Sequence, residues 1–340
     1  MPQVAVVILN FNGKVFLEKF LPAVLTHSRP FARVIVADNA STDGSLEMLR
    51  EKFPDVSLIC NPENLGFSSG YNLALGQIEA DYFVLLNSDI EVTPGWIEPV
   101  ISMMESDRSI AACQPKILSY QQPRQFEYAG AAGGFIDKYG YPFCRGRLFQ
   151  TLETDHGQYN DNREVFWASG ACMFVRADLY QAHGGLDDDF FAHMEEIDFC
   201  WRLKNAGFRI VYCAQSTVYH IGGGTLPKAS ARKTYLNFRN NLSLLYKNLP
   251  DNRFFRVILS RLFLDMAASL KFLVEGGLDD FLAVVRAHAH FYRKIPRLRR
   301  KRSHLKRLDS VPGVYQKNVA VSYFLLRKKK YSDLSREKFS

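Results

Sequence analysis

Tyr82-Phe-Val-Leu-Leu-Asn-Ser-Asp89 is the stretch that decides the fold, because an uninterrupted apolar run ends there in three small polar residues. Its first five residues are typical of a strand buried on both faces of a parallel sheet. In open α/β sheets, ligands lie beyond the carboxyl ends of the strands. A carboxylate there can hold a hard divalent cation whose other ligands are water and substrate phosphates. Asn, Ser and Asp also favour turns, so a binding site and a plain turn are both open.

The chain before this stretch alternates between strand and helix patterns. Short apolar runs predict strands at 4–9, 34–37, 56–59 and 82–86, and the intervening patterns predict helices at 14–26, 45–52 and from 72 to about 77. This alternation predicts an α/β fold with a doubly wound, mostly parallel sheet and helices on both faces. Right-handed crossovers then bring the polar loops to one edge of the sheet, at 10–13, 38–45, 61–72 and 87–89.

These loops are rich in Asn, Asp, Ser and Gly, which offer hydrogen bonds and close backbone approach. Asp38 can accept from a ribose hydroxyl or a base N–H, and Asn64, Gly66 and Gly70 can bring the backbone near a ligand at a helix N-terminus. Capping chemistry explains any one loop equally well, but four loops on one edge favour a site. The chain has no phosphate-binding Gly-x-x-x-x-Gly-Lys-Ser/Thr loop and no Gly-x-Gly-x-x-Gly after the first strand. This disfavours phosphate-loop ATPases and dinucleotide-dependent dehydrogenases.

The pattern becomes irregular after Asp89. We expect a helix at 94–106, a strand at 110–118, a long irregular segment at 119–164, and a strand at 165–175 interrupted by Ser169-Gly170. A loop of that length is uncommon without a functional or lid role. Glycine inside a strand marks a bulge or the close approach of a ligand. Trp167 is then either a core residue or a platform for a sugar ring.

Three carboxylates lie within four residues at Glu195, Glu196 and Asp198. On a helix, Glu195 and Asp198 share a face and Glu196 is turned about 100° away. Acidic residues complement the positive end of a helix, which is one interpretation. Apolar neighbours on both sides favour another, since burial raises a carboxyl pKa towards that of a general base. Arg202 would be an ion partner for this cluster or a phosphate ligand.

His220 follows a strand pattern at 210–213, which we expect to be the last strand, and it precedes three glycines. A histidine next to a glycine run can ligate a metal or bind phosphate. A purely structural histidine is the alternative.

Composition limits the class of protein. The 340 residues are 47% apolar, enough for one large or two smaller cores, and the six cysteines are scattered without a Cys-x-x-Cys pair. We expect reduced thiols in a cytosolic protein without a signal peptide or a membrane span. Residues 1–227 hold 17 Lys/Arg and 27 Asp/Glu, whereas 228–340 hold 26 and 8. An acidic body followed by a basic region predicts two different partner surfaces.

The basic region reads as helices at 231–249, 254–274 and 278–292, followed by basic runs at 293–307 and 327–330. Apolar helices with basic clusters suit the surface of an anionic bilayer, and a solvated basic tail is the alternative. No nucleic-acid-binding module accompanies the charge, so we expect no nucleic acid partner. We predict two domains, a catalytic one at 1–227 and a mostly helical one at 228–340.

The sequence resembles the inverting glycosyltransferases of family 2, in their rhamnosyltransferase-like group, from about residue 4 to 241. The matching motifs are Ile8–Asn12, Val36–Asp43, Asn64–Asn72, Leu85–Asp89, Trp167–Ala171, Phe191–Asp198, His220 and Arg239-Asn240. The resemblance implies a GT-A fold, a nucleotide-diphosphate sugar donor, and a divalent cation, Mg²⁺ or Mn²⁺. It also implies that the chain acts in cell-surface polysaccharide synthesis, on a glycan or lipid-linked acceptor.

Residue roles are carried over from the same resemblance. Asp38 would contact the nucleoside, Asp89 would bind the metal, and His220 would be a second metal ligand or would contact the leaving diphosphate. The family's Glu-Asp pair, whose Asp is the base, aligns with Glu195-Glu196. Glu196 therefore stands where Asp is usual, and the choice of base among Glu195, Glu196 and Asp198 stays open.

The remaining candidate ligands come from the same motifs and from the segments beside them. We expect nucleotide-sugar contacts from Asn10, Asn12, Asp38, Asn39, Asn64, Gly66, Gly70 and Asn87. We expect acceptor or sugar contacts from Trp167, Ser169, Gly170, Trp201 and Arg202. The expected activity is transfer of a hexose or deoxyhexose by a cytoplasmic enzyme, peripheral on the inner face of the cell membrane. The alternatives are a binding protein with a decayed transferase site and a sugar nucleotidyltransferase.

Overall fold

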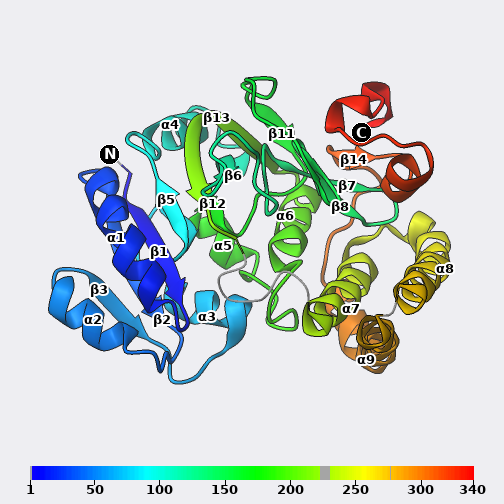
Figure 1. Cartoon of the computed structure of the whole chain (residues 1–340), viewed down its shortest axis with the longest axis horizontal. Helices are drawn as coiled ribbons and strands as arrows, with labels where there is room; N and C mark the ends of the chain where they lie inside the picture. Colours follow the sequence, from blue (N-terminus) through cyan, green and yellow to red (C-terminus); the bar gives the residue numbers. More distant parts are fainter. Residues whose placement is uncertain (1, 223–229, 276) are drawn as a thin grey trace.

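The structure is a computed structural model that describes residues 2–222, 230–275 and 277–340. Within these residues, a long mixed sheet forms the centre of the molecule, with the C-terminal helices beside it (Figure 1). The strand order is β11-β13-β6-β12-β4-β1-β2-β3, and β5 pairs with β13. The predicted α/β class is therefore confirmed.

The first half of the fold follows the predicted alternation closely. Its elements are β1 (Val4–Asn10), α1 (Lys14–Ser28), β2 (Ala32–Asp38), α2 (Ser45–Lys52), β3 (Ser57–Cys60), α3 (Gly66–Leu75) and β4 (Tyr82–Asn87). The strands pair in parallel, with Asn10 opposite Asp38 and Leu9 opposite Asn87. The polar ends of β1, β2 and β4 therefore meet at one edge. Helix α3 begins inside the predicted loop, six residues before position 72.

Both faces of this sheet are buried. Val6 and Val84 point into an apolar cluster under α1, α2 and α4, whereas Val7 and Leu85 point into a second cluster under α3, α5 and α6. Alternate residues of one strand thus enter opposite cores, as expected for strands that lack a polar face. This burial holds the strand ends rigidly beneath the loops of the candidate site.

The second half of the sheet mixes strand directions. It contains β5 (Ile90–Val92), α4 (Glu98–Ser106), β6 (Ile110–Ser119), β11 (Arg163–Val165), β12 (Cys172–Arg176), α5 (Ala177–Ala182), α6 (Glu195–Asn205) and β13 (Arg209–His220). Strand β12 lies antiparallel between β4 and β6. The strand expected to end at Cys213 continues through an irregularity in its pairing with β6 and ends at His220. That continuation brings His220 to the same edge as Asp89.

The long segment 119–164 is not irregular throughout, which corrects the prediction. It contributes β7 (Gly134–Asp137), β8 (Pro142–Cys144), β9 (Arg147–Leu148) and β10 (Thr151–Leu152) to a second, five-stranded sheet. Its last strand is β14 (Val314–Tyr315), so β13 is not the final strand of the chain. Strands of two to four residues are too short to show a periodic pattern.

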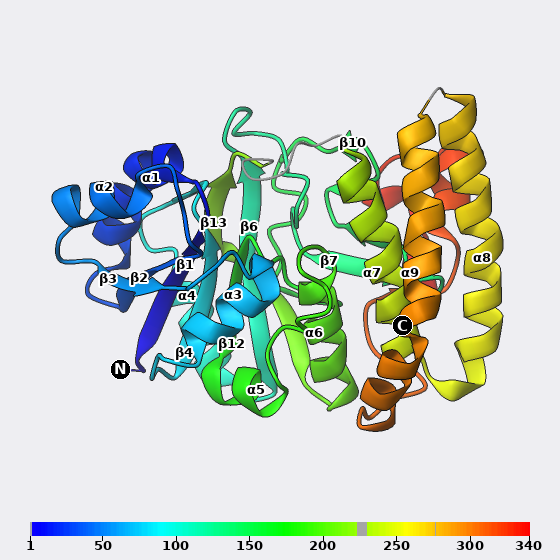
Figure 2. The same cartoon turned by 90° about the horizontal axis from the view of Figure 1, so that it is seen from below.

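The C-terminal region contains α7 (Ala231–Asn248), α8 (Asp251–Val274) and α9 (Leu278–Ser303), which lie side by side (Figure 2). Short helical turns follow at Val321–Leu325, Tyr331–Asp333 and Arg336–Lys338. Helix α9 continues past the predicted end at 292 and includes much of the basic run. The predicted domain boundary at 227/228 lies outside the described residues. In the described parts of the chain, no helix has the length and hydropathy needed to cross a membrane.

Candidate active site

The first group of candidate residues lies where β1 and β2 end. The Asn10 side-chain amide donates to Asp38 Oδ1 at 2.9 Å, and the Ser41 backbone N–H donates to Asp38 Oδ2 at 2.9 Å. Asn10 and Asp38 are almost fully buried. A carboxylate fixed by two donors keeps free lone pairs in a defined direction. This geometry suits recognition of one hydroxyl or N–H group.

The neighbouring loops are tied together by asparagines. The Asn39 side chain donates to Asn64 Oδ1 at 3.0 Å and accepts from Asn61 at 3.1 Å. The exposed Asn12 accepts from the Thr42 backbone N–H at 2.8 Å. These contacts join the loops after β1, β2 and β3. The asparagines thus shape the edge of the site, whether or not they also contact a ligand.

Gly66 and Gly70 are closely packed by the protein itself. Gly66 has φ +75°, and a Cβ there would lie 2.5 Å from the Phe191 ring. A Cβ at Gly70 would lie 3.1 Å from Leu9 and 3.2 Å from Asn39. Gly66 therefore needs glycine both for packing and for its left-handed backbone, whereas a side chain at Gly70 would require its neighbours to move by a few tenths of an ångström.

Asp89 and His220 form the second group. His220 Nε2 lies 3.1 Å from Asp89 Oδ1 and 3.5 Å from the Asn87 side-chain amide. The other ring nitrogen, Nδ1, lies 3.2 Å from Glu127 Oε2. Asp89, His220 and Glu127 are all buried. Glu127 comes from the segment 119–164, and sequence reasoning missed it because nothing local connects it to His220.

The charges in this group support one another. Burial by itself lowers the pKa of His220, but the hydrogen bonds and charges of Asp89 and Glu127 outweigh it and raise that pKa to about 10. Burial would raise the pKa of each carboxyl group, yet His220 lowers the pKa of both Asp89 and Glu127. In the absence of a cation, the imidazolium is thus the counter-ion of two buried carboxylates.

The donor set at this edge suits a divalent cation. Within the described residues, no cluster of three or more His, Cys, Asp or Glu side chains is arranged to hold a metal. Asp89 and His220 supply one carboxylate oxygen and one imidazole nitrogen at adjoining strand ends. Mg²⁺ and similar cations are often held by one or two protein groups plus substrate phosphates. The pair therefore fits a cation that binds together with a diphosphate.

The acidic pair forms the third group. Glu195 and Glu196 begin α6, and one carboxylate oxygen of each is buried without a hydrogen-bond partner. Burial raises the pKa of Glu196 to about 7, although backbone N–H groups at the helix start partly oppose this. Burial and the neighbouring charge of Glu196 raise the pKa of Glu195 well above its usual range. A carboxyl with a pKa near 7 can accept a proton at neutral pH.

A short loop links this pair to the Asp89 edge. The Asn87 backbone N–H donates to the Ala171 carbonyl oxygen at 2.9 Å. A Cβ on the preceding Gly170 would lie 3.7 Å from Glu196 Cβ and 3.2 Å from the Phe67 ring. Gly170 therefore lies over Glu196, next to the strand end that carries Asp89.

The backbone before Glu195 is strained, and a side chain from α7 holds it in place. Phe191, His193 and Met194 have φ of 65°, 69° and 72°, which non-glycine residues rarely adopt. The Asn240 amide on α7 lies 3.0, 2.8 and 2.7 Å from the carbonyl oxygens of Phe190, Ala192 and His193. Local strain of this kind persists only where the surroundings enforce it, and it clusters at functional sites.

Asp198 and Arg202 pair with each other, which confirms one of the two roles predicted for Arg202, that of an ion partner in the acidic cluster. Asp198 is completely buried and accepts from Arg202 at 2.9 Å, Lys247 at 2.8 Å and Asn248 at 2.7 Å. Arg202 also donates to the carbonyl oxygens of His183 and Gly185. Asp198 thus joins α6 to α7, and Arg202 joins α6 to the loop that follows α5. We therefore exclude Asp198 as the base and Arg202 as a phosphate ligand.

Trp167 and Trp201 both lie in the core, which for Trp167 is one of the two predicted alternatives. Trp167 is 4% exposed, its indole N–H donates to the Phe135 carbonyl oxygen at 2.9 Å, and its ring fills the space beside Gly134. Trp201 is 6% exposed and packs edge-on against Phe166. Both are core residues without a face for a sugar.

Ser169 is likewise committed within the protein. It is buried, its hydroxyl donates to the Ala129 carbonyl oxygen, and its backbone N–H donates to Gln114 at 2.9 Å. Of the five predicted acceptor residues, only Gly170 lies next to a candidate catalytic group.

Comparisons with known proteins agree with this geometry. The family model described as glycosyl transferase family 2 matches residues 5–184. A curated relative, the N-acetylglucosaminyl-diphospho-decaprenol L-rhamnosyltransferase of Mycobacterium tuberculosis, is 28% identical over 232 residues, which are 63% of this chain and 75% of that protein.

Solved structures of glycosyltransferases share the fold. GalNAc-T7 with UDP, GalNAc and Mn²⁺ matches with a TM-score of 0.57 and 15% identity, over 74% of this chain but only 49% of that chain. The mannosyltransferase of Pyrobaculum calidifontis with GDP-Man and Mn²⁺ matches with a TM-score of 0.52 and 15% identity, over 89% of this chain and 84% of that chain. At these identities the likeness concerns the GT-A fold.

Proposed function

The chain belongs to glycosyl transferase family 2, and from this premise we propose that it moves a hexose or deoxyhexose from a nucleotide-diphosphate sugar to a hydroxyl of a glycan or lipid-linked saccharide, with inversion. The observation that carries the proposal is the short loop Gly170-Ala171, which lies over the partly buried Glu196 and is hydrogen-bonded to Asn87, two residues before the Asp89 of the Asp89–His220 pair. A cation site for the donor diphosphate and a base with a pKa near 7 are what such a transfer needs.

The donor would lie along the loops that follow β1, β2 and β3. In this proposal Asp38 accepts from the nucleoside, and Asn10 holds its carboxylate in place. The cation, Mg²⁺ or Mn²⁺, would be held by Asp89 and His220 and would offset the charge of the diphosphate. The structures with Mn²⁺ and nucleotides support this assignment by analogy of fold.

The reaction is a single displacement. Glu196 accepts the proton of the acceptor hydroxyl while the hydroxyl oxygen bonds to the anomeric carbon. The bond from that carbon to the donor phosphate oxygen breaks, and its electron pair leaves with the nucleoside diphosphate. Attack from the face opposite the leaving group inverts the anomeric configuration. Glu195 would stay protonated, because burial and the charge of Glu196 both raise its pKa.

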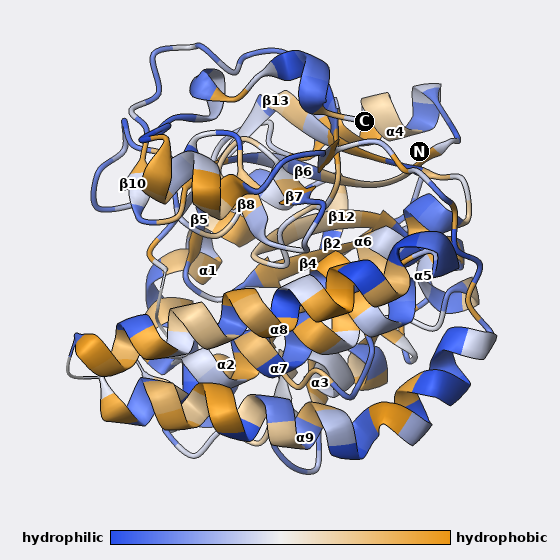
Figure 3. Cartoon of the chain, turned by 90° about the vertical axis from the view of Figure 1, so that its right-hand side faces the viewer, coloured by the Kyte–Doolittle hydropathy of each residue, from blue (hydrophilic) through white to orange (hydrophobic). Residues whose placement is uncertain are grey.

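The rhamnosyltransferase relative is named for a diphospho-decaprenol acceptor, so we also propose that this chain takes a lipid-linked acceptor at the inner face of the cell membrane. Helix α8 supplies a surface for this (Figure 3). Seven large apolar side chains along it are exposed, namely Phe255, Leu259, Phe263, Met266, Leu270, Leu273 and Val274. The first six, from Phe255 to Leu273, are spaced by three or four residues and form one stripe about 27 Å long, which Val274 extends at the end of the helix.

The basic residues contribute less to that surface than their number suggests. Within the basic run 293–307, Lys294, Arg297 and Lys301 pair with Asp189, and Lys301 also pairs with Asp187. The run 327–330 is largely exposed and directly follows exposed apolar residues at 324–326. We therefore propose that α8 and residues 321–330, rather than α9, contact an anionic bilayer. In this proposal the catalytic domain at 1–227 carries out the transfer, and the C-terminal domain at 228–340 contacts the membrane.

A donor panel with product analysis tests the proposed activity. The purified chain is incubated with UDP-, dTDP- and GDP-sugars, a membrane lipid extract as acceptor, and Mn²⁺ or Mg²⁺. The proposal predicts transfer from one donor, with an anomeric configuration opposite to that of the donor in the product NMR spectrum. A retained configuration would contradict the displacement, and nucleotide exchange onto a sugar phosphate would favour a nucleotidyltransferase.

A further inference from the structure

Glu127 lies beside His220, at the point where the segment 119–164 returns to the sheet. Its Oε2 is 3.2 Å from His220 Nδ1, an ion-pair contact whose angle falls outside that of a hydrogen bond. On the opposite side of the ring, Nε2 lies 3.1 Å from Asp89 Oδ1. The imidazole therefore lies between two carboxylates, with one nitrogen near each.

Glu127 is itself firmly placed. It is 5% exposed, and its carboxylate accepts from the Ala129 backbone N–H, while its own backbone N–H donates to the Ile117 carbonyl oxygen at 3.1 Å. Gly222 adds a second constraint, since a Cβ there would lie 2.6 Å from Glu127 Oε1. The carboxylate therefore fills a space that any side chain at position 222 would take.

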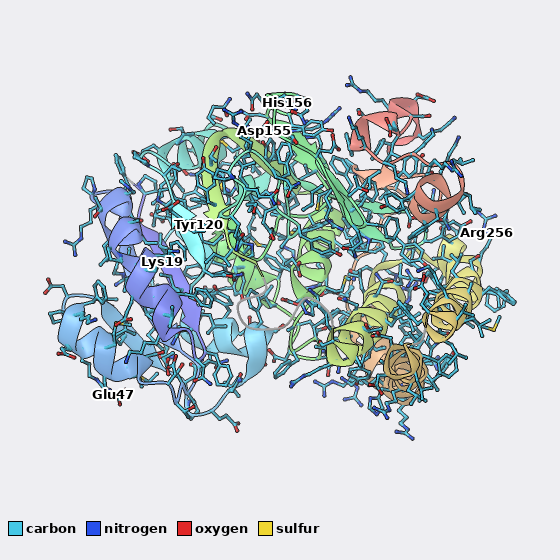
Figure 4. The ribbon with its side chains drawn as sticks, viewed as in Figure 1. Lys19, Glu47, Tyr120, Asp155, His156 and Arg256 are labelled. Atoms are coloured by element: carbon cyan, nitrogen blue, oxygen red, sulfur yellow. The ribbon has the colours of Figure 1, made fainter. Side chains whose placement is uncertain are left out.

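The backbone of His220 is also fixed from the same segment. The Tyr120 backbone N–H donates to the His220 carbonyl oxygen at 3.0 Å. The Tyr120 ring in turn lies under Lys19 of α1, with Lys19 Nζ 4.3 Å from the ring centre (Figure 4). With the backbone held, the remaining freedom of His220 is rotation of its ring, which Glu127 opposes.

We propose that Glu127 is a positioning residue for cation binding: it accepts the Nδ1–H of His220 and so presents the Nε2 lone pair to the Asp89 side. This inference rests on the proposed function, because it assigns His220 to the cation. A histidine that binds a metal through one nitrogen commonly donates its other N–H to a carboxylate or carbonyl, which fixes both tautomer and orientation. Glu127 is the carboxylate that faces this nitrogen.

Manganese binding tests the proposal without relying on turnover. Free Mn²⁺ is measured by electron paramagnetic resonance as it is titrated into the full chain with UDP or GDP present, against a protein-free blank, for the wild type, Glu127→Ala and Glu127→Gln. We expect Glu127→Ala to weaken Mn²⁺ binding roughly 10- to 100-fold, the usual effect of losing such a partner. Glu127→Gln, which keeps an acceptor oxygen, should recover part of the loss.

Glu153 provides the matched control. It is a buried carboxylate of the same segment that accepts from Tyr159 at 2.9 Å and from the Tyr331 backbone at 3.0 Å, away from His220. Glu153→Gln should leave Mn²⁺ affinity unchanged. Equal affinities for Glu127→Ala, Glu127→Gln and Glu153→Gln would overturn the inference, and thermal unfolding shows which variants are folded.

Two further variants separate this inference from the proposed function. Asp89→Asn and His220→Asn should each weaken Mn²⁺ binding more than Glu127→Gln. If both weaken it and the Glu127 variants do not, the positioning role fails and the cation site stands. If neither weakens it, the proposed cation site itself is wrong.

Discussion

His220 Nε2 lies 3.1 Å from Asp89 Oδ1, although 131 positions separate the two residues in the chain. The contact exists because β13 continues past its irregularity to His220 and pairs there with β5, just after Asp89. The end of the sheet thereby brings an acidic and a basic side chain together where β4 ends.

Replacing Glu196 with Gln should lower kcat by roughly 10²- to 10⁴-fold, because a positioned general base contributes that much. Donor affinity should change little, since Glu196 lies across Gly170 from the donor loops. Steady-state kinetics and donor titration by calorimetry measure the two quantities. If Glu196→Gln keeps full turnover and Glu195→Gln loses it, the base is Glu195.

The rate should depend on pH through the same carboxyl. Burial raises the pKa of Glu196 to about 7, and only the ionised form accepts a proton. The kcat/KM profile should therefore rise with pH and level off above about 7. A profile that is flat between pH 5 and 8 would speak against Glu196 as the base, provided that a stability control shows the fold intact over this range.

Replacing Asn240 with Ala should reduce turnover, although we expect no contact between Asn240 and the substrate. The Asn240 amide holds the carbonyl groups of Phe190, Ala192 and His193, which precede the acidic pair. Release of this backbone should misplace Glu196, and a misplacement of 1 Å can cost about 100-fold in rate. Hydrogen exchange at residues 190–194 should rise in parallel.

Asn252→Ala is the control for this prediction, because Asn252 is exposed and donates only to Asp309. It should alter neither the rate nor exchange at 190–194. Unchanged kinetics in Asn240→Ala would show that the backbone at 190–194 keeps its conformation without the Asn240 amide.

Replacing Asp198 with Ala should destabilise the fold strongly. The change leaves Lys247, which is buried, without one of its two carboxylate partners, and it removes one of the two acceptors of the Asn248 amide. Breaking a buried ion pair from one side typically costs about 3–5 kcal/mol. Urea unfolding should show a free-energy loss of this order, whereas Glu51→Ala, at an exposed surface position, should show almost none. A small loss for Asp198→Ala would mean that water replaces the carboxylate.

Binding to vesicles should depend on the exposed stripe of α8. Phe255 and Phe263 are 76% and 61% exposed, and burying each ring in a bilayer is worth about 1.5–3 kcal/mol. The double change to Ser should therefore reduce co-sedimentation with anionic vesicles at least tenfold. Val15→Ser, an equally exposed apolar position on α1, should have no effect. Equal binding of both variants to vesicles would contradict membrane contact through α8 and would favour a second protein copy as the partner of this helix.

The first half of the fold was predictable from local patterns, because each strand and helix there has its own periodicity. Helix α2 has the predicted bounds, and β1, β2 and β4 differ by only one or two residues at each end. Strands β7 to β10 were missed because they have only two to four residues, and β7 also pairs with the distant β14.

The candidate site was predictable in its motifs but not in the partners of its residues. Asp198 resembled Glu195 and Glu196 in sequence, yet Lys247 and Asn248, some fifty positions later, bind it. Glu127 had no signal of its own, and only the pairing of β13 with β6 places it near His220. Side-chain partners of this kind depend on tertiary contacts that no local pattern encodes.

The most direct test of the proposed transferase site is release of nucleoside diphosphate from the donor and acceptor that the panel identifies, with Mn²⁺, with a chelator, and after Mn²⁺ is restored. The account predicts that wild-type release stops with the chelator and returns with Mn²⁺, and that Asp89→Asn releases almost nothing under any of the three conditions. Equal release by the wild type and Asp89→Asn, or release that ignores the chelator, would contradict a cation-assisted transfer at Asp89 and His220.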